Sequence, residues 1–333
     1  MKPPGFAGLV LSVCRGRRIV GGMKPDLDSC LVIGISSRAL FDLEEANRVF
    51  EEQGVEAYRE YQREHEDEIL GKGTAFHLVE ALLRLNRFDP QKRLVEVIIM
   101  SRNSPDTGLR IFRSVEHYGL DVTRSAFSGG NSLAPYLSAY SVDLFLSKFE
   151  QDVQAALDSG FAAAMCYPPP EDFNPDTDQI RMAFDADAVV FSEESERIFR
   201  EQGLTAFEEH ERQNAREPLE SGPFAKLLRT LSFLQSEVKA EKPPVRLAIV
   251  TARNSPAHER VIRTLRAWDV NVDEAFFLGG LPKDQVLRAY RAHIFFDDQH
   301  GHVALASRGV PAGMVPYRSN SPLRVVETGK EKK

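Results

Sequence analysis

The sequence predicts an α/β protein made of two duplicated, doubly wound parallel-sheet units, each with a helical cap inserted after its first strand. The first observation is an internal repeat, because Gly54 recurs as Gly203 and Gly129 as Gly279, at offsets of 149 and 150 residues. The second is that short apolar runs alternate with amphipathic stretches in both halves, which is typical of parallel strands joined by helices. The matching segments are EEQGVEAY with REQGLTAF, SRNSP with ARNSP, and SAFSGG with AFFLGG.

Five strands are expected in each half. In the first half they are LVIGI from residue 31, VEVIIM from 95, SAFS from 125, VDLFL from 142 and AAAMC from 162. In the second half they are RMAF from residue 181, LAIV from 247, AFFL from 275, HIFF from 293 and AGMV from 312. A polar, helix-forming insertion separates the first two strands of each half, at about residues 43–94 and 193–244. These insertions are longer than ordinary connections, so we expect each to form a lid.

The ends and the middle of the chain lack this alternation. We expect residues 1–30 to be an unstructured leader, with Met23 as an alternative start of translation, and residues 318–333 to be a tail. The proline-rich segment 168–180 cannot continue a helix and is expected to link the halves. The two units therefore span residues 31–167 and 181–317.

The composition is that of an ordinary folded protein, with 42% hydrophobic and 27% charged residues among 333. A net charge of −7 argues against a general nucleic-acid binder, so any anion-binding site must be local. Three widely spaced cysteines suit a reducing compartment and are expected to be packing residues: Cys14, Cys30 and Cys166. No segment reaches the roughly 18 uninterrupted apolar residues of a membrane span, so we expect a cytosolic protein without a membrane partner. Whether the protein forms a homo-oligomer is left open by the sequence.

Polar side chains follow the expected strands of the second half at their carboxyl ends, where open parallel sheets bind ligands. Four strand ends supply, in order, a carboxylate pair, a hydroxyl, an ammonium and another carboxylate pair. The residues are Asp185 and Asp187, Thr251, Lys283, and Asp297 and Asp298. Turn formers such as Asn, Gly or Ser would be ordinary at these places, so the set indicates a functional site.

The chemistry of this set points to phosphoryl transfer. Carboxylates crowded into one crevice need a divalent cation to neutralise them, and all-oxygen ligation implies Mg²⁺. Asp185 could attack phosphorus in line, while Asp187 protonates the leaving oxygen and later activates water. Thr251 and Lys283 would hold the phosphate.

The remaining members of the set have supporting roles. Asp297 is the expected direct metal ligand, with Asp298 as a second ligand or as the residue behind it. Arg253 closely follows Thr251 in the sequence and could either bind the phosphate or brace the carboxylates. The full expected metal site is Asp185, the backbone carbonyl of Asp187, Asp297 and Asp298.

The same strand ends in the first half have lost every metal-binding carboxylate. Counting along the repeat places these residues opposite each other: Ile35 and Asp185, Ser37 and Asp187, Leu133 and Lys283, Ser147 and Asp297, and Lys148 and Asp298. This half cannot assemble Mg²⁺ chemistry, but it offers neutral and cationic donors to an anion, namely Ser36, Ser37, Arg38 and Asn131. It could clamp the substrate or form a regulatory pocket, whereas Ser and Asn are equally ordinary turn formers.

A family resemblance rests on these residues. DADAV, followed by the threonine, the lysine and the aspartate pair, resembles the four motifs of the haloacid-dehalogenase-like phosphatase superfamily. A narrower resemblance, over about residues 31–317, is to the cytosolic 5′-nucleotidase I family. It rests on AFDADAVVFSEESERIF, FEEHE, PLESGP, VTAR and HIFFDDQ in the second half, and on ISSRALFD, YQREHEDE, TGLRIFRSVEHYGLD and SGGNS in the first.

The resemblance implies two haloacid-dehalogenase-like units and hydrolysis of nucleoside 5′-monophosphates, AMP-like or deoxynucleotide, through an aspartyl-phosphate with Mg²⁺. By position it makes Asp185 the nucleophile, Asp187 the acid and base, Thr251 and Lys283 phosphate ligands, and Asp297 a magnesium ligand. In the lids, Phe207 with His210, and Tyr61 with His65, could share a helix face and stack on a base. Aromatic residues at helical spacing are more often core, and EEHERQNARE otherwise indicates a solvated helix face.

Two rival functions stay open. The first is a phosphatase of the same superfamily that acts on another small phosphomonoester, because the four motifs specify phosphate chemistry rather than the leaving group. The second is a nucleotide-sensing regulator with incidental turnover, suggested by the pairing of an intact with a degenerate half. A nucleotide effector is accordingly an expected partner in that reading.

Overall fold

The computed structural model describes residues 27–168, 170, 173, 179–238 and 242–324. Most of the expected leader and parts of the expected linker and tail lie outside these residues. The described end of the leader forms a short 3-10 helix, Leu27–Ser29, followed by the buried Cys30. At the other end, Leu323 is buried against Tyr317, so this part of the expected tail packs on the second half.

All ten expected strands form. In the first half they are β1 (Leu31–Ile35), β2 (Val95–Ser101), β3 (Arg124–Phe127), β4 (Leu144–Ser147) and β5 (Ala162–Cys166). In the second half they are β6 (Ile180–Phe184), β7 (Val245–Thr251), β8 (Glu274–Phe277), β9 (Ile294–Asp297) and β10 (Ala312–Met314). Strands β1, β2 and β4 are buried along their whole length, which explains their unbroken apolar runs.

The ten strands make one continuous sheet in the order β3-β2-β1-β4-β5-β10-β9-β6-β7-β8. The order of the second half mirrors that of the first. All pairings are parallel except the junction, where β10 runs antiparallel to β5 with Gly313 opposite Cys166. The sequence predicted two sheet units but gave no sign that they share a sheet, because strand pairing between distant segments leaves no local pattern.

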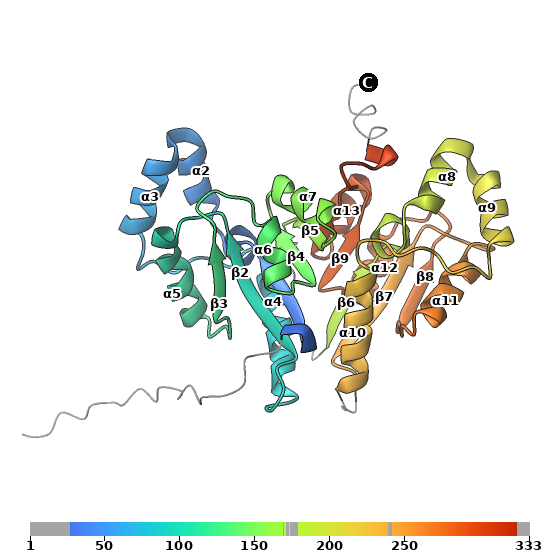
Figure 1. Ribbon diagram of the computed structural model, residues 1–333, viewed down its shortest axis with the longest axis horizontal. Coiled ribbons are helices and arrows are strands. Elements are labelled where there is room, and N and C mark those ends of the chain that lie inside the picture. The colour runs from blue at the N-terminus through green and yellow to red at the C-terminus, as the bar shows by residue number, and fades with distance from the viewer. Residues whose placement is uncertain (1–26, 169, 171–172, 174–178, 239–241, 325–333) are drawn as a thin grey trace, which may run out of the picture.

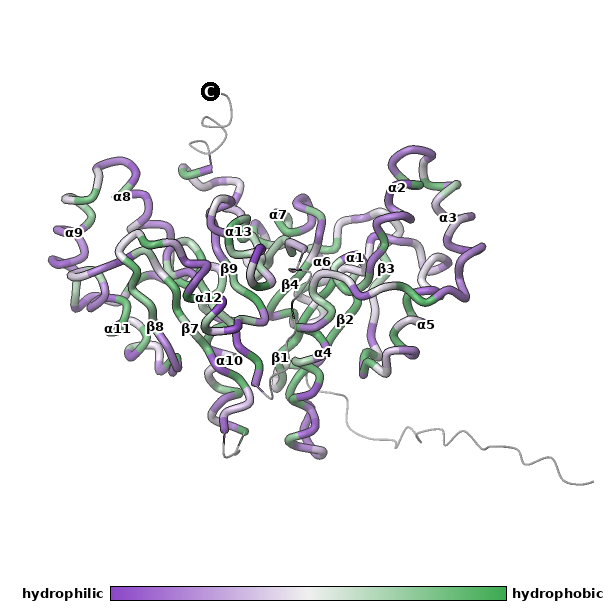
Figure 2. Tube along the Cα trace, turned by 180° about the vertical axis from the view of Figure 1, so that it is seen from behind, coloured by the Kyte–Doolittle hydropathy of each residue, from purple (hydrophilic) through white to green (hydrophobic). Residues whose placement is uncertain are grey.

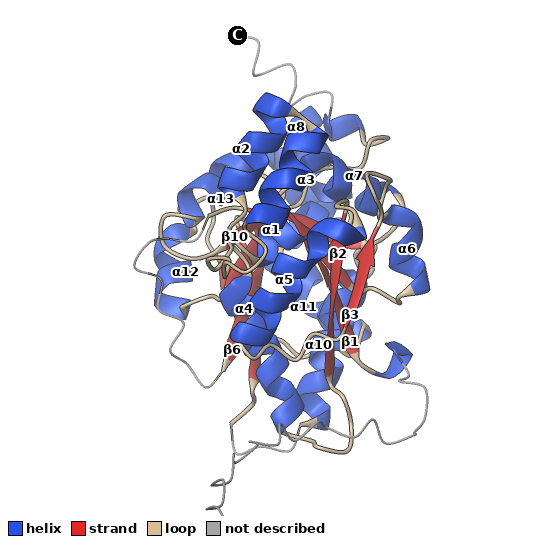
Figure 3. Ribbon diagram, turned by 90° about the vertical axis from the view of Figure 1, so that its left-hand side faces the viewer, coloured by secondary structure: helices blue, strands red, loops and turns tan. Residues whose placement is uncertain are grey.

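Helices lie on either side of the strands (Figure 3). In the first half they are α1 (Ser37–Leu40), α2 (Glu44–Gln53), α3 (Val55–Glu64), α4 (Phe76–Arg84), α5 (Leu109–His117), α6 (Ala134–Ala139) and α7 (Glu150–Asp158). In the second half they are α8 (Glu194–Gln202), α9 (Leu204–Gln213), α10 (Ala225–Glu237), α11 (His258–Ala267), α12 (Asp284–Tyr290) and α13 (His300–Ala306).

Only part of each insertion stands away from the sheet. The pairs α2–α3 and α8–α9 both lie at the top of Figure 1, and Figure 2 shows them as largely hydrophilic. We call these two helix pairs the lids. The helices α4 and α10 from the same insertions belong instead to the core, where residues such as Leu82 and Leu228 are fully buried. The expected insertions of 43–94 and 193–244 therefore each combine a lid with a core helix.

Each lid returns to the sheet at a matching place. The bridges Phe41 with Lys72 and Phe191 with Ser221 close the two insertions, and a glycine follows each of them in the returning chain. A Cβ on Gly73 would lie 2.6 Å from the Phe41 nitrogen, and a Cβ on Gly222 would lie 2.2 Å from the Phe191 oxygen. Both turns therefore need a residue without a side chain.

The expectations on cysteines and membrane spans are tested by the same described residues. Cys30 and Cys166 are free thiols in the core, and burial raises their pKa values to about 11 and about 12. Both are thus packing residues, while Cys14 lies outside the described part. Among the described helices, none combines the length and the apolar character that crossing a bilayer requires.

Candidate active site

The predicted polar residues of the second half meet at one edge of the sheet. Strand β6 lies between β7 and β9, so the residues that end these three strands are neighbours in space. Lys283 joins them as the residue that precedes α12. All of them are less than about a tenth exposed: Asp185, Thr251, Lys283, Asp297 and Asp298.

Lys283 joins two of the carboxylates. Its ammonium nitrogen lies 2.8 Å from Asp185 Oδ1 and 2.6 Å from Asp297 Oδ2. The buried ammonium is held in its charged form, since these two carboxylates outweigh the effect of burial and raise its pKa. Lys283 can therefore neutralise one negative charge of the cluster.

Three carboxylates form a cluster with the geometry of a cation site. Asp185, Asp297 and Asp298 each offer one oxygen, and these oxygens all lie within 4.8 Å of one another. One ammonium cannot balance three buried carboxylates. Their hard oxygen atoms suit Mg²⁺, so the donor set fits the cation that the sequence implied.

The pKa values of these three carboxylates shift in different directions. Burial, opposed by Lys283, raises the pKa of Asp185 to about 7, and burial together with the charge of Asp297 raises the pKa of Asp298 well above its usual range. Burial acts in the same direction on Asp297, but Lys283 and His302 outweigh it and lower its pKa. A divalent cation would remove the cost of keeping all three ionised.

Asp187 lies in a wide turn that leaves β6. The Phe191 amide donates to the Ala186 carbonyl over five residues, and Asp187 keeps extended dihedral angles within that turn. Ala188 has a φ of 60°, a left-handed conformation that a small residue tolerates best. The turn thus presents Asp187 two residues beyond Asp185 instead of coiling it into a helix.

Arg253 forms an ion pair with Asp187. Its Nε donates to Asp187 Oδ2 at 2.8 Å and its Nη2 donates to Oδ1 at 2.6 Å, a two-pronged ion pair. Its Nη1 donates to Glu211 Oε2 at 2.5 Å. Of the two roles that the sequence left open for Arg253, these contacts are those of the bracing role. Thr251 Oγ1 accepts a hydrogen bond from the Arg253 amide at 3.2 Å, and its hydroxyl can still donate its own proton to another group.

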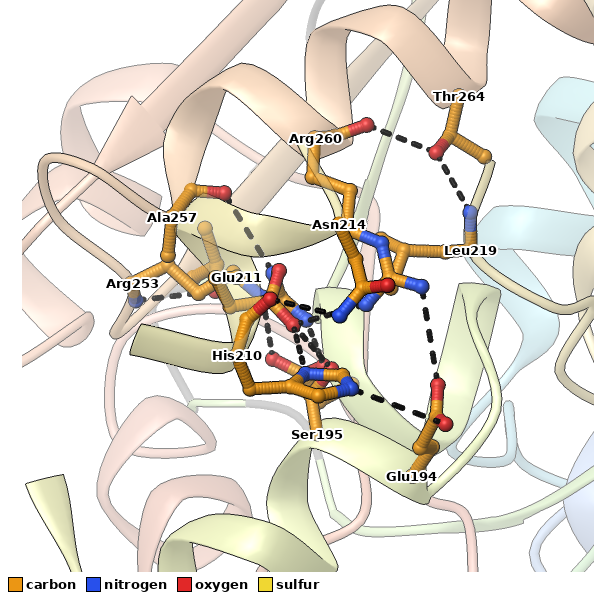
Figure 4. A network of polar contacts seen from close by, with 12 residues as sticks. Glu194, Ser195, His210, Glu211, Asn214, Leu219, Arg253, Ala257, Arg260 and Thr264 are labelled. Carbon is orange, nitrogen blue, oxygen red and sulfur yellow. Dashed lines mark hydrogen bonds and ion pairs between the residues drawn. The ribbon is translucent and has the colours of Figure 1, made fainter. Parts of the chain in front are cut away.

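Glu211 is the centre of a buried polar network that the sequence analysis missed (Figure 4). It has no exposed surface, and besides Arg253 it accepts hydrogen bonds from Ser195 at 2.8 Å and from Arg260 at 3.1 Å. Burial would raise its pKa, but Arg253 and the hydrogen bonds lower it. The network joins the lid helices α8 and α9 to the turn that carries Asp187. The interpretation of this charged run as a solvated face is therefore wrong at Glu211.

Two further residues were missed because they lie beyond the motif positions. The Tyr317 hydroxyl donates to Asp298, and it also accepts a hydrogen bond from Arg200 of α8 at 3.0 Å. His302 Nδ1 lies 3.3 Å from Asp297 Oδ2. A signal for Tyr317 does exist in the sequence, since Tyr167 lies 150 residues before it and also follows the last strand of its half.

The predicted residues of the second-half lid lie beside this network. Phe207 is buried under the Arg253 guanidinium, whose central carbon is 5.4 Å from the ring centroid, and it meets Phe199 edge to face. His210 Nδ1 is 3.4 Å from Glu211 Oε1. In the first-half lid, Tyr61 and His65 stack on each other at 4.0 Å, which is a contact within one helix.

Ser36, Ser37 and Arg38 of the first half line one cavity, and two pairings from the repeat are wrong, Ile35 with Asp185 and Ser37 with Asp187. The Ser36 amide donates to Leu146 as the Asp185 amide donates to Phe296, so Ser36 rather than Ile35 occupies the position of Asp185. Arg38 then stands two residues on, where the second half has Asp187. The shift arises because the turn after β1 closes over four residues, from Phe41 to Ser37, and is one residue shorter.

The other pairings agree with the structure. Leu133 and Lys283 both immediately precede a helix, and Ser147 and Asp297 both end a strand. Lys148 pairs with Glu44, which also receives Arg38 at 2.9 Å. Among the predicted anion ligands, Ser37 Oγ lies 3.1 Å from Ser101 Oγ, and Ser36 Oγ caps α1 through the Ala39 amide.

Asn131 stands apart from those residues. It is exposed, and its side-chain amide donates to the Ser128 carbonyl at 2.9 Å within its own loop. This contact is that of a turn former, which was the alternative reading of the residue.

Comparison with known proteins gives one consistent answer. The family model of 5′-nucleotidases matches residues 23–322. The chain is also 36% identical over 294 residues to human cytosolic 5′-nucleotidase 1B, a match that covers 85% of this chain and 48% of the relative. The chain thus spans about half the length of that curated relative. No solved structure matches it. The family match and the human relative agree with the resemblance seen in the sequence, and the chain belongs to the 5′-nucleotidase family, within its cytosolic 5′-nucleotidase I branch.

Proposed function

We propose that the protein is a Mg²⁺-dependent 5′-nucleotidase that hydrolyses nucleoside 5′-monophosphates, AMP-like or deoxynucleotide, in the cytosol. The observation that carries this proposal is the buried cluster of Asp185, Asp297 and Asp298 around Lys283, in a chain of the 5′-nucleotidase family. The name of the human relative, a cytosolic 5′-nucleotidase, supports both the activity and the compartment. The motifs of the haloacid-dehalogenase-like superfamily support an aspartyl-phosphate mechanism.

Mg²⁺ would be held by Asp185, Asp297, Asp298 and the backbone carbonyl of Asp187, and it would supply positive charge to the phosphoryl oxygens. In the first step, a carboxylate oxygen of Asp185 attacks phosphorus and the bond to the 5′ oxygen breaks. Asp187 gives that oxygen its proton, so the nucleoside leaves as an alcohol. Lys283 and the Thr251 hydroxyl stabilise the charge on the transferring group.

In the second step, water attacks the aspartyl-phosphate. Asp187, now a carboxylate, takes a proton from that water, and phosphate leaves Asp185 as a free carboxylate. The ion pair with Arg253 suits this ionised state of Asp187, whereas the proton-donating state has less need of it. Arg253 therefore positions Asp187 for the hydrolytic step.

The decisive experiment measures phosphate release from a panel of monophosphates by the full chain, with added Mg²⁺ and with EDTA. We expect release from AMP and deoxynucleoside monophosphates with Mg²⁺ and none with EDTA. Asp185→Asn should lower the rate by at least about a thousandfold while thermal unfolding stays cooperative. Asp121→Asn, which changes an exposed aspartate in the first half, is the matched control and should keep full activity.

Two outcomes would refute the proposal. Near-normal activity of the Asp185→Asn variant would overturn the nucleophile. Much faster turnover of sugar phosphates than of nucleoside monophosphates would show that the substrate is another small phosphomonoester.

A further inference from the structure

A cavity of about 340 Å³ lies at the carboxyl ends of the first-half strands, against the first lid. Ser37 and Ser101 line it from the strand ends, and Phe50 and Tyr58 line it from α2 and α3. It is the first-half counterpart of the active site, because Ser36 at its edge occupies the position of Asp185. Its size lies in the range of pockets that hold small organic ligands.

The charges on this cavity are reversed relative to the catalytic half. Three guanidinium groups line it, those of Arg38, Arg59 and Arg102, against one carboxylate, Asp152, which pairs with Arg102 at 3.6 Å. Counted from the lid glycines Gly54 and Gly203, Arg59 stands where the second half has Glu208. Arg38 also pairs with Glu44 and Arg59 with Glu56, but Glu44 is shared with Lys148, so the groups around this cavity keep one positive charge in excess. The catalytic cluster, by contrast, has an excess of carboxylates.

Buried donors without partners lie in the same cavity. Arg38 Nε and Ser104 Oγ are both buried, and neither has a hydrogen-bond partner among the described residues. An unpaired buried donor costs free energy, so such groups mark places where a ligand completes the hydrogen bonding. Both lie on the side of the cavity where the second half binds phosphate, since Arg38 follows β1 and Ser104 follows β2.

The lids preserve one feature in both halves. Phe50 meets Tyr58 edge to face at 6.0 Å, and Phe199 meets Phe207 edge to face at 6.2 Å. Each pair flanks a glycine with positive φ, Gly54 in the first lid and Gly203 in the second. The metal-binding residues differ between the halves while this aromatic pair is kept, which indicates that both sites face a similar apolar group.

We propose that the first-half cavity binds a nucleoside 5′-phosphate without Mg²⁺ and without hydrolysing it. Arg38, Ser37 and Ser104 receive the phosphate, and the Phe50–Tyr58 pair contacts the base. Hydrolysis does not follow, because Ser36 stands in place of the nucleophilic Asp185 and its hydroxyl caps α1. The assignment of the ligand class rests on the proposed function, since it takes the second site to bind what the first half also binds.

Binding in EDTA separates the two sites. Without a cation nothing links the catalytic carboxylates to a phosphate, so binding in EDTA that depends on Arg38 reports the first-half cavity. Calorimetric titration of the full chain with AMP in EDTA should show one site per chain. Arg38→Ala should weaken AMP and inorganic phosphate alike by at least about tenfold. Arg48→Ala, at an exposed arginine of the neighbouring lid helix α2, should change neither.

A second variant keeps the test valid if the loss of Arg38 disturbs folding. Phe50 is 46% exposed, so Phe50→Ala should leave the fold intact. It should weaken AMP by about threefold or more and leave inorganic phosphate unchanged, because phosphate makes no aromatic contact. Phe233→Ala, at an exposed phenylalanine of α10, is the matched control.

Each outcome of these titrations supports or overturns the proposed nucleotide site in the first half. Absence of AMP binding in EDTA, with Mg²⁺-dependent phosphate release intact, would overturn this inference and leave the proposed function standing. AMP binding in EDTA that withstands both Arg38→Ala and Phe50→Ala would also overturn it. Binding in EDTA that is lost in these variants, in a protein that releases no phosphate with Mg²⁺, would support the site and refute the proposed function.

Discussion

Arg253 connects the chemistry of the site to a lid helix through one side chain. We predict that Arg253→Lys keeps the charge but loses the two-pronged contact with Asp187 and the bond to Glu211. The free energy of unfolding in urea should fall by roughly 1–3 kcal/mol, and the rate of phosphate release should fall at least about tenfold. Unchanged stability and rate would contradict the bracing role.

The matched control for this prediction is Arg263→Lys. Arg263 pairs with Glu259 on the exposed face of α11 at 2.8 Å. Exposed pairs contribute little, so the change in unfolding free energy should stay within about 0.5 kcal/mol and the rate should not change.

His293 makes folding depend on pH. It is buried, its Nδ1 accepts a hydrogen bond from the Arg181 amide at 3.1 Å, and burial followed by the charge of Arg181 lowers its pKa to about 4. A histidine in the unfolded chain has a pKa of about 6.5. As the pH falls, it therefore takes up its proton before the buried His293 of the folded protein does. The contribution of His293 to the free energy of unfolding is therefore complete above about pH 6.5 and is lost as the pH falls toward 4. We predict a loss of about 2 kcal/mol between pH 7.5 and pH 5 from this residue.

His293→Asn isolates that contribution in urea unfolding at the two pH values. An asparagine oxygen can accept the same hydrogen bond but does not titrate in this range. The variant should lose about 2 kcal/mol less than the wild type between the two pH values. An equal pH dependence in both proteins would assign the effect to other groups.

The strand-end residues of the site could be predicted from the sequence, whereas the residues that hold them could not. The position of Asp185 follows from a local pattern, since an apolar run ends there. Glu211 lies among eight other charged or polar residues in EEHERQNARE, and only the packing of α9 against Arg253 and Arg260 shows that it is buried. Burial of a charged helix residue is decided by tertiary contacts.

At the scale of elements, two turns of different length distinguish the halves at the position of Asp187. The turn after β6 closes over five residues and the turn after β1 over four. The extra residue keeps Asp187 out of helical geometry. The sequence could not reveal this difference, because the insertions that follow restore the overall offset of the repeat. All ten strands, by contrast, follow from local apolar runs.

The return of each lid to the sheet gives an element-scale prediction. Gly222→Ala would place a Cβ 2.2 Å from the Phe191 carbonyl oxygen, so the returning chain must move. We expect a loss of roughly 1–3 kcal/mol or more in urea unfolding, together with a lower rate of phosphate release.

Gly301→Ala is the comparison for this change. Gly301 lies in α13, and nothing lies within 4 Å of a Cβ built there. Alanine is the better helix former, so this variant should be neutral or more stable by up to about 1 kcal/mol. Equal losses in the two glycine variants would refute the steric argument.

At the scale of the whole molecule, the continuous sheet predicts that the halves unfold together. The single tryptophan, Trp268, packs on Phe191 at 5.4 Å and so reports on the second half alone. Circular dichroism reports on both halves. Because β5 and β10 share hydrogen bonds at the junction, we expect the two signals to give one coincident urea transition.

Gly313→Val tests the junction directly. A Cβ on Gly313 would already lie 3.0 Å from the Phe296 ring and 3.1 Å from Ala164 of β5. The larger side chain should shift both unfolding signals equally. A circular dichroism transition that separates from the tryptophan signal would show instead that the halves fold as independent domains.

The antiparallel pairing of β5 with β10 resembles the interface of a symmetric dimer. The two strands are equivalents in the repeat, and the strand order reads alike from either edge of the sheet. An edge strand that pairs antiparallel with its own equivalent is what a two-fold axis creates in a symmetric dimer. A single half of this chain, paired with a copy of itself along that edge, would build the same ten-stranded sheet. The junction therefore has the geometry of a two-fold symmetric dimer interface, held within one chain.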